Sequence, residues 1–315
     1  MARKKTKSIK KNNKTILYAV VVIVLIIFGY LGRDNIKDLY NEIISDVDLK
    51  VEGEFTVHFI DVGQGDSILI QNSNDEFMLI DTGESSEYNK LTSYLENFNV
   101  TDFKYVIFTH PHSDHMGSAD KIVKNYNIEN LIMSSGTNNT KTFERLVDEI
   151  EKKKLEIIPA VPGEVFKFGE AEFLILAPEL DEYKNLNNYS VVIKMTYGKT
   201  DFLFTGDMEK ELENEVMKFC EKNNINLSSD VLKVAHHGSS TSSQAEFLRL
   251  ISPKVAIIMC GKDNSYNHPN LQTVGRIESV GATILRTDLL GDIVMISDGN
   301  DLSVKKGRGE AEKIN

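Results

Sequence analysis

The chain has 315 residues, with 36 Lys and Arg against 47 Asp and Glu and a formal net charge of −11. That length allows one large domain or two modest ones with a sizeable core. The acidic balance excludes a general binder of nucleic-acid backbones, because such a protein needs a basic patch. Two cysteines, Cys220 and Cys260, are too few for a disulfide scaffold. We expect buried thiols there, with a single disulfide between them as the alternative.

The first 32 residues form a segment of their own. Residues 1–14 carry seven Lys and Arg and no acid, and residues 15–32 contain no charged residue. Eighteen helical residues span about 27 Å, close to the roughly 30 Å hydrocarbon core of a bilayer. We expect a single-pass transmembrane anchor here. The alternative is a cleaved signal peptide, whose apolar region is usually shorter, about 7–15 residues, and is followed by a small-residue cleavage site.

The positive charge that precedes this segment predicts an orientation. By the positive-inside rule, residues 1–14 are a cytoplasmic tail and the rest of the chain lies outside the cell membrane. Residues 33–315 then hold 29 basic and 47 acidic residues, a net charge of −18. Residues 33–53 are expected to be a juxtamembrane helix or linker, residues 54–306 one domain, and residues 307–315 a polar tail.

Short apolar runs and amphipathic stretches alternate along residues 54–306. Runs rich in Val, Ile and Phe predict strands at 55–62, 66–72, 76–83, 104–110, 129–135, 155–161, 171–178, 189–198, 201–207, 230–238 and 255–261, with closing strands in 283–304. Helical periodicity predicts helices at 88–98, 115–126, 140–153, 208–224, 241–251 and 270–279. Strands come first in each half and then alternate with helices. We therefore expect an α/β fold, an αββα sandwich of two mixed sheets with outer helices.

The stretch FTHPHSDHMG, residues 108–117, holds His110, His112, Asp114 and His115 within six positions. It follows a predicted strand and precedes a predicted helix. His110 and His112 are two residues apart and point to one side of an extended backbone. Asp114 and His115 lie where the chain turns and can approach from another direction. Imidazoles with a carboxylate are the usual ligands of Zn²⁺, Mn²⁺ or Fe, so the stretch predicts a metal site.

Other predicted strands end in the same way. Asp81, Asp207, and the pair His236 and His237 each follow an apolar run and stand close to a glycine. An aspartate before a glycine is often only a turn residue. Four such strand ends that face one crevice would nevertheless build a site for two metals, with Asp207 as a bridging carboxylate and Asp81 as an acceptor for a ligand imidazole.

These motifs resemble the metallo-β-lactamase fold superfamily. FIDVGQGDSILIQ, NNYSVVIKM, LFTGD, AHHGS and NHP further resemble the extracytoplasmic hydrolase domain of ComEC-type DNA-uptake proteins and standalone relatives that include phosphorylcholine-esterase-like enzymes. The resemblance covers residues 55–298. Gly63-Gln64-Gly65 within it is expected to be a tight turn between two strands, with Asp61 and Asp66 as loop stabilisers near the mouth of the site.

The resemblance implies roles for particular residues. It places His110 and His112 on a first metal, Asp114 and His115 on a second, and Asp207 between them, with His237 or else His236 completing the second site. In many members of the superfamily a third histidine binds the first metal, and this chain has Asn187 and Asn188 in that region. An amide oxygen is a harder, weaker ligand, which favours a labile or Mn²⁺-preferring site. His268 matches a family feature with two open roles, substrate contact and loop structure.

The resemblance and the ligand set together predict a hydrolase with two divalent ions, Zn²⁺ or Mn²⁺. A water held between two such ions loses a proton near neutral pH and becomes a nucleophile. Asp114 would orient that water, and Asn188 or His236 would donate to the leaving group. The expected substrate is a phosphodiester, either single-stranded DNA or a small or surface-attached diester. The alternative is a non-catalytic metal-binding assembly module associated with DNA uptake or the cell surface. The sequence identifies no protein partner.

Overall fold

A computed structural model describes residues 54–180, 182–306 and 312–314. The expected cytoplasmic tail, anchor and linker over residues 1–53 lie outside these residues, as does most of the expected tail from 307 to 315. Within the described ranges, no helix has the length and hydropathy needed to cross a bilayer.

The larger sheet has nine strands. Its spatial order is β16-β15-β14-β1-β2-β3-β4-β5-β6. The strands are β1 (Phe55–Phe59), β2 (Ile68–Gln71), β3 (Phe77–Ile80), β4 (Asp102–Phe108), β5 (Asn127–Met133), β6 (Ile157–Pro159), β14 (Ile293–Ser297), β15 (Leu302–Lys306) and β16 (Glu312–Ile314). Pairing is antiparallel from β16 to β3 and parallel from β3 to β6.

The smaller sheet repeats that plan with seven strands. Its order is β13-β12-β11-β10-β9-β8-β7. The strands are β7 (Val165–Phe168), β8 (Ala171–Ala177), β9 (Val192–Tyr197), β10 (Thr200–Phe204), β11 (Val231–Lys233), β12 (Val255–Ile258) and β13 (Thr283–Arg286). Pairing is antiparallel from β7 to β10 and parallel from β10 to β13. Both sheets are therefore mixed, and in each the parallel half begins at one strand pair, β3–β4 or β10–β11.

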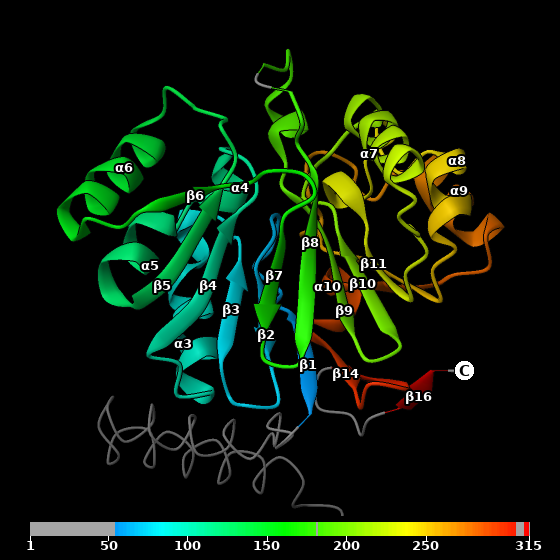
Figure 1. Ribbon diagram of the computed structural model, residues 1–315, viewed down its shortest axis with the longest axis horizontal. Helices are drawn as coiled ribbons and strands as arrows, with labels where there is room; N and C mark the ends of the chain where they lie inside the picture. Colours follow the sequence, from blue (N-terminus) through cyan, green and yellow to red (C-terminus); the bar gives the residue numbers. More distant parts are fainter. Residues whose placement is uncertain (1–53, 181, 307–311, 315) are drawn as a thin grey trace, which may run out of the picture. The chain divides into compact units, whose positions relative to one another are not determined.

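Helices cover the outer faces of the two sheets (Figure 1). On the larger sheet these are α3 (Tyr88–Asn97), α5 (Ala119–Asn125) and α6 (Lys141–Lys153), and on the smaller sheet α7 (Lys210–Asn223), α8 (Ala245–Ile251) and α9 (Leu271–Ser279). Two short helices, α4 (Ser113–Met116) and α10 (Thr287–Leu290), lie within connections. The expected arrangement of two mixed sheets between helices is confirmed.

The main core lies between the sheets. Alternate residues of the strands point inward, which is why Val57 and Phe59 of β1 join Phe202 and Phe204 of β10 in one buried cluster. The intervening residues of the smaller sheet, such as Leu203, pack outward against the helices with Val216 of α7. Cys220 and Cys260 are buried free thiols in that outer cluster, as expected from the sequence.

Several boundaries differ from those expected. Strand β7 was not predicted, because its Val165 and Lys167 are exposed and it forms the edge of its sheet. The helix expected at 115–126 is interrupted at residues 117 and 118, between α4 and α5. The helix expected at 241–251 begins only at Ala245, since Ser242 and Gln244 before it donate to Met208 and Glu213 rather than to a helix. The closing segment contains α10 as well as strands.

Candidate metal centre

The candidate site lies beyond the carboxyl ends of the two strand pairs at which parallel pairing begins. Asp81 follows β3, His110 follows β4, Asp207 follows β10 and His237 follows β11. In open α/β sheets, ligands bind beyond the carboxyl ends of strands where the connection pattern changes. Both sheets make that change at the same end of the sandwich, so their strand ends meet there.

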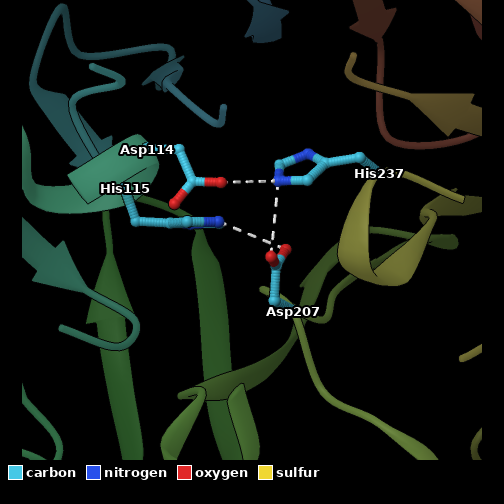
Figure 2. A group of neighbouring side chains, drawn as sticks. All are labelled: Asp114, His115, Asp207 and His237. Carbon is cyan, nitrogen blue, oxygen red and sulfur yellow. Dashed lines mark hydrogen bonds and ion pairs between the residues drawn. The ribbon is translucent and has the colours of Figure 1, made fainter. Parts of the chain in front are cut away.

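Four side chains form the centre of the site, namely Asp114, His115, Asp207 and His237 (Figure 2). Each offers a ligand atom, and these atoms all lie within 4.8 Å of one another. His115 Nε2 is 3.2 Å from Asp207 Oδ1, and His237 Nε2 is 3.2 Å from Asp114 Oδ2 and 3.3 Å from Asp207 Oδ2. Two acids and two imidazoles, from α4 and from the segments after β10 and β11, thus converge on one point.

The polar atoms of this group fit a metal ion. His115 Nε2 and Asp207 Oδ1 are buried and make no hydrogen bond, although they lie 3.2 Å apart. Their lone pairs are aimed at a shared space, as metal ligands require and as a hydrogen-bonded pair does not. The group is therefore a His/Asp cluster that could bind metal ions.

Contacts behind the two imidazoles fix their orientation. His115 Nδ1 lies 2.7 Å from Asp81 Oδ2, and His237 Nδ1 lies 2.9 Å from the backbone oxygen of Met259. An imidazole that donates through Nδ1 presents Nε2 to the cluster as a ligand atom. The geometry places Asp81 in the position expected for an acceptor behind a ligand histidine.

His110 and His112 lie beside this group. The ring centres of His110 and His115 are 4.1 Å apart, and His110 Nε2 is 3.1 Å from His112 Nδ1. His110 is fully buried, whereas His112 is partly exposed. The structure thus brings the whole His-x-His-x-Asp-His motif to one place.

His236 and His237 take different positions. His237 belongs to the central group, whereas His236 lies at its edge, with Nε2 3.9 Å from Asp207 Oδ2 and Nδ1 3.4 Å from Glu209 Oε1. Both residues have positive φ, an uncommon backbone conformation outside glycine that is held most often at functional sites. The turn aims two consecutive side chains to different sides.

The side chains of Asn187 and Asn188 point to different partners. Asn187 faces the site, with Nδ2 3.2 Å from Glu209 Oε1 and a buried Oδ1 that has no hydrogen-bond partner. The Asn188 amide instead donates to Glu211 and accepts from the backbone of Glu209. The residue beside the cluster is thus Asn187, one position earlier than the asparagine expected there. Nothing in the sequence distinguishes two adjacent asparagines.

A pocket of about 270 Å³ opens onto the cluster. It is lined by Gln64, His112, Ser113, Asp114, Asn187, Asp207, His236, His237, Tyr266 and His268. His268 is partly buried, and its ring centre lies 5.5 Å from that of His236. Most lining groups are polar, as suits a polar substrate.

Gly65 lets the Gly63-Gln64-Gly65 turn approach the segment from His110 to His115. The backbone N–H of Asp66 donates to the backbone oxygen of Asp114 over 3.1 Å, and a Cβ at Gly65 would collide with that same oxygen. Gly63 and Gly65 both have positive φ, as a tight turn requires. The turn therefore supports Asp114 directly.

A buried ion pair lies behind the cluster. Lys233 Nζ forms an ion pair with Asp66 Oδ2, donates to the backbone oxygen of Gly206 over 2.9 Å and lies 3.7 Å from Asp207 Oδ1. Lys233 and Asp66 are both almost completely buried. Asp66 was expected to be a loop stabiliser near the mouth of the site, and the structure places it at the base instead.

Lys233 is not identified as a site residue from the sequence, although its position in the strand pattern indicates a buried charge. Strand β11 alternates, with Val231 facing the core between the sheets and Leu232 facing the helices, so Lys233 occupies an inward position. A charged residue at an inward strand position needs a buried partner. The sequence alone could not name Asp66 as that partner.

The electrostatics of the site favour positive charge. Burial alone would lower the pKa of His237, but Asp207, Asp114 and Asp66 raise it to about 9. The pKa of His115 is likewise raised well above its usual value, since Asp207, Asp81 and Asp66 outweigh burial. The pKa of Asp207 lies well below its ordinary value despite burial, because of His237 and His115. Cations therefore stabilise this cluster strongly.

We predict that Lys233→Met destabilises the metal-free protein by about 3–5 kcal/mol, because it removes the buried cation that pairs with the Asp66 carboxylate. The double variant Lys233→Met with Asp66→Asn should recover most of that loss. Urea unfolding of the single and double variants measures both effects. Lys167→Met is the control, since the ion pair of Lys167 with Glu172 is exposed and is expected to contribute little. Equal destabilisation in the single and double variants would contradict the pairing.

A second prediction concerns Glu213, whose carboxylate accepts from the backbone N–H groups of Ser243 and Gln244 and so holds the turn before α8. Burial raises the pKa of Glu213 to about 7. The folded protein thus binds this proton more tightly than the unfolded chain, so its contribution is complete below about pH 4.5 and is lost as the pH rises through 7.

We expect the unfolding free energy of wild type, relative to Glu213→Gln, to fall by up to about 3 kcal/mol between pH 4.5 and 8. Denaturant unfolding of both proteins across this range is the measurement. Parallel pH profiles for the two proteins would rule out the shift.

Comparison with known proteins agrees with this geometry. Residues 60–262 match the family model described as the metallo-beta-lactamase superfamily. The chain is 32% identical to ComE operon protein 3 of Bacillus subtilis over 262 residues, which is 78% of this chain and 33% of that protein. It is 30% identical to Competence protein ComA of Neisseria gonorrhoeae over 243 residues, 76% of this chain and 32% of that protein. The chain therefore spans about a third of the length of these curated relatives.

Solved structures give the same fold. The metallo-beta-lactamase fold protein YhfI from Bacillus subtilis superposes with a TM-score of 0.51 at 13% identity, over 78% of this chain and all of that one. The residues matched by the family model include β4, the His110–His115 segment that follows it, Asp207 and His237. The chain thus belongs to the metallo-β-lactamase superfamily and is related to the competence proteins at about 30% identity.

Proposed function

We propose that this protein is a metal-dependent hydrolase of phosphodiester bonds that works with two divalent ions, Zn²⁺ or Mn²⁺. The observation that carries the proposal is the buried cluster of Asp114, His115, Asp207 and His237. His115 Nε2 and Asp207 Oδ1 in it have no hydrogen-bond partner, and Asp114, Asp207 and His237 line an open polar pocket. His110 and His112 are the proposed ligands of a further ion beside it. Such ions, when bound, supply Lewis acidity and lower the pKa of water.

Asp114 is suited to orient the attacking water. Its side chain is 25% exposed to the pocket, whereas those of the other three cluster residues are almost completely buried. Hydrogen bonding from His237 lowers the pKa of Asp114 even though burial opposes it, so the group stays a carboxylate and an acceptor. A carboxylate at the pocket floor can hold one proton of a water and aim its lone pair at a substrate phosphorus.

His236 and Asn187 are the proposed hydrogen-bond donors to substrate. Both line the pocket, and their side chains lie 3.4 Å apart. Burial lowers the pKa of His236, so its ring is neutral near pH 7 and offers one N–H. In this arrangement Asn187 takes the role expected for Asn188. The relation to competence proteins favours single-stranded DNA as the substrate, and a small or surface-attached diester is the second choice.

The test is hydrolysis of bis-p-nitrophenyl phosphate and of single-stranded DNA by the full chain after loading with Mn²⁺ or Zn²⁺. We expect turnover that EDTA abolishes and added metal restores, and a loss of about 100-fold or more in kcat for Asp114→Ala. Leu250→Ala, a half-exposed position on α8, is the control. Metal binding without turnover of any diester would favour the assembly-module alternative, and equal rates for Asp114→Ala and wild type would exclude this mechanism.

We further propose that residues 15–32 anchor the protein in the cell membrane with the hydrolase domain outside. The support is the uncharged run of 18 residues behind seven basic ones. The full chain should stay with membranes during carbonate extraction and be degraded by protease added to intact spheroplasts, whereas a chain lacking residues 1–32 should remain in the cytosol. Full protection from the protease would contradict the orientation, and release by carbonate would contradict the anchor.

A further inference from the structure

An exposed aromatic residue stands at the rim of the candidate metal centre. Tyr266 lines the same pocket as Asp114, Asp207 and His237, and 66% of its surface is accessible. It belongs to the connection between β12 and α9. No residue of this connection is among the proposed metal ligands or the proposed hydrogen-bond donors to substrate. A large aromatic side chain left exposed beside a polar pocket is a candidate contact for ligand.

Tyr266 is the outermost of a series of rings that leads to the cluster. It stacks on His268 with ring centres 5.8 Å apart and planes 25° apart. The ring of His268 in turn lies 5.5 Å from that of His236 and 6.3 Å from that of His237. Since His268 covers one face of the tyrosine ring and most of the residue is exposed, the other face is open to a planar group. Two ring-to-ring steps separate that face from a cluster histidine.

The connection that carries Tyr266 is held firmly. The side chain of Asn264 donates to the backbone oxygens of Gly261 and His268 and accepts from the backbone N–H of His268, over 2.7 to 3.0 Å. The backbone N–H of Asn270 donates to the oxygen of Gly238. A Cβ on Gly238 would lie 2.6 Å from the Cβ of Pro269, so the connection packs tightly on the turn that follows His237. Tyr266 is therefore preorganised relative to the cluster.

We propose that Tyr266, supported by His268, is a subsite that stacks a nucleobase of a single-stranded nucleic acid whose phosphodiester lies at the Asp114–His237 cluster. This inference rests on the proposed function and specifies its substrate class. Aromatic side chains stack on any base because each base has a π face. Residues 33–315 carry a net charge of −18, so general neutralisation of the phosphate backbone contributes little, and stacking would add affinity to the contacts that the proposed ions, His236 and Asn187 make with one diester.

The chain contains no tryptophan, which allows a direct test of stacking. In Tyr266→Trp the single indole should lose emission when an oligodeoxythymidylate is added to the metal-loaded full chain. An abasic oligomer of the same length has the same phosphates but no bases, and should leave the emission unchanged. Equal responses to the two oligomers would overturn the subsite, as would a response to glycerophosphocholine in place of the oligodeoxythymidylate.

Kinetics provide a second test. For Tyr266→Ala we expect kcat/KM on the oligodeoxythymidylate to fall about tenfold more than on the abasic oligomer. Tyr266→Phe keeps the ring and should retain the wild-type preference between the two, and Leu250→Ala is the surface control. An equal loss on both oligomers would overturn the subsite while the hydrolase function stands. If no diester is turned over, the proposed function fails. The fluorescence response of Tyr266→Trp to the two oligomers then decides the subsite by itself.

Discussion

Neutralisation of buried carboxylates is the constraint on which this site depends. Asp66, Asp81 and Asp207 lie almost completely buried at one end of the sandwich, where an unpaired charge would be strongly destabilising. The protein supplies one fixed cation, Lys233, and two imidazoles with raised pKa values. The positive charge at His115 and His237 can be exchanged for a metal ion, whereas Lys233 stays. The same acids that require neutralisation thus make the cluster suited to bind a metal ion.

The sheets supply the rigidity that this arrangement needs. Each sheet changes from antiparallel to parallel pairing at one strand pair, and the residues after those strands form the cluster. Ligand atoms must hold their positions to within a few tenths of an ångström, and strand ends fixed by a packed core provide this. The hydrogen bond from Asp66 to Asp114 and the contact at Gly65 join the metal-binding loop to the same framework.

Much of this could be predicted from the sequence, for physical reasons. Alternating apolar runs specify strands, and a polar ligand residue after such a run specifies a strand end, so the positions of His110, Asp207 and His237 followed from pattern. What could not be predicted depends on spatial neighbours. Which strands and turns meet decides that Lys233 pairs with Asp66 beneath the cluster. It also decides that Asn187, and not Asn188, faces the site. Edge strand β7 has an apolar pattern, VFKF, but its four residues are too short a run to distinguish a strand from a turn.

The division of ligands between the sheets has a further consequence. Asp114 and His115 lie on α4, which follows β4 of the larger sheet, while Asp207 and His237 follow strands of the smaller one. A bound ion would thus add a cross-link between the two layers. Metal binding and the relative position of the two sheets would therefore be thermodynamically linked. Any change that moves the sheets apart at this end would lower the affinity for a metal ion. The connection that bears Tyr266 contributes no ligand atom to that cross-link. Its exposed Tyr266 can change to suit another substrate, whereas Pro269, which packs on the turn after His237, is part of the framework that holds the ligands.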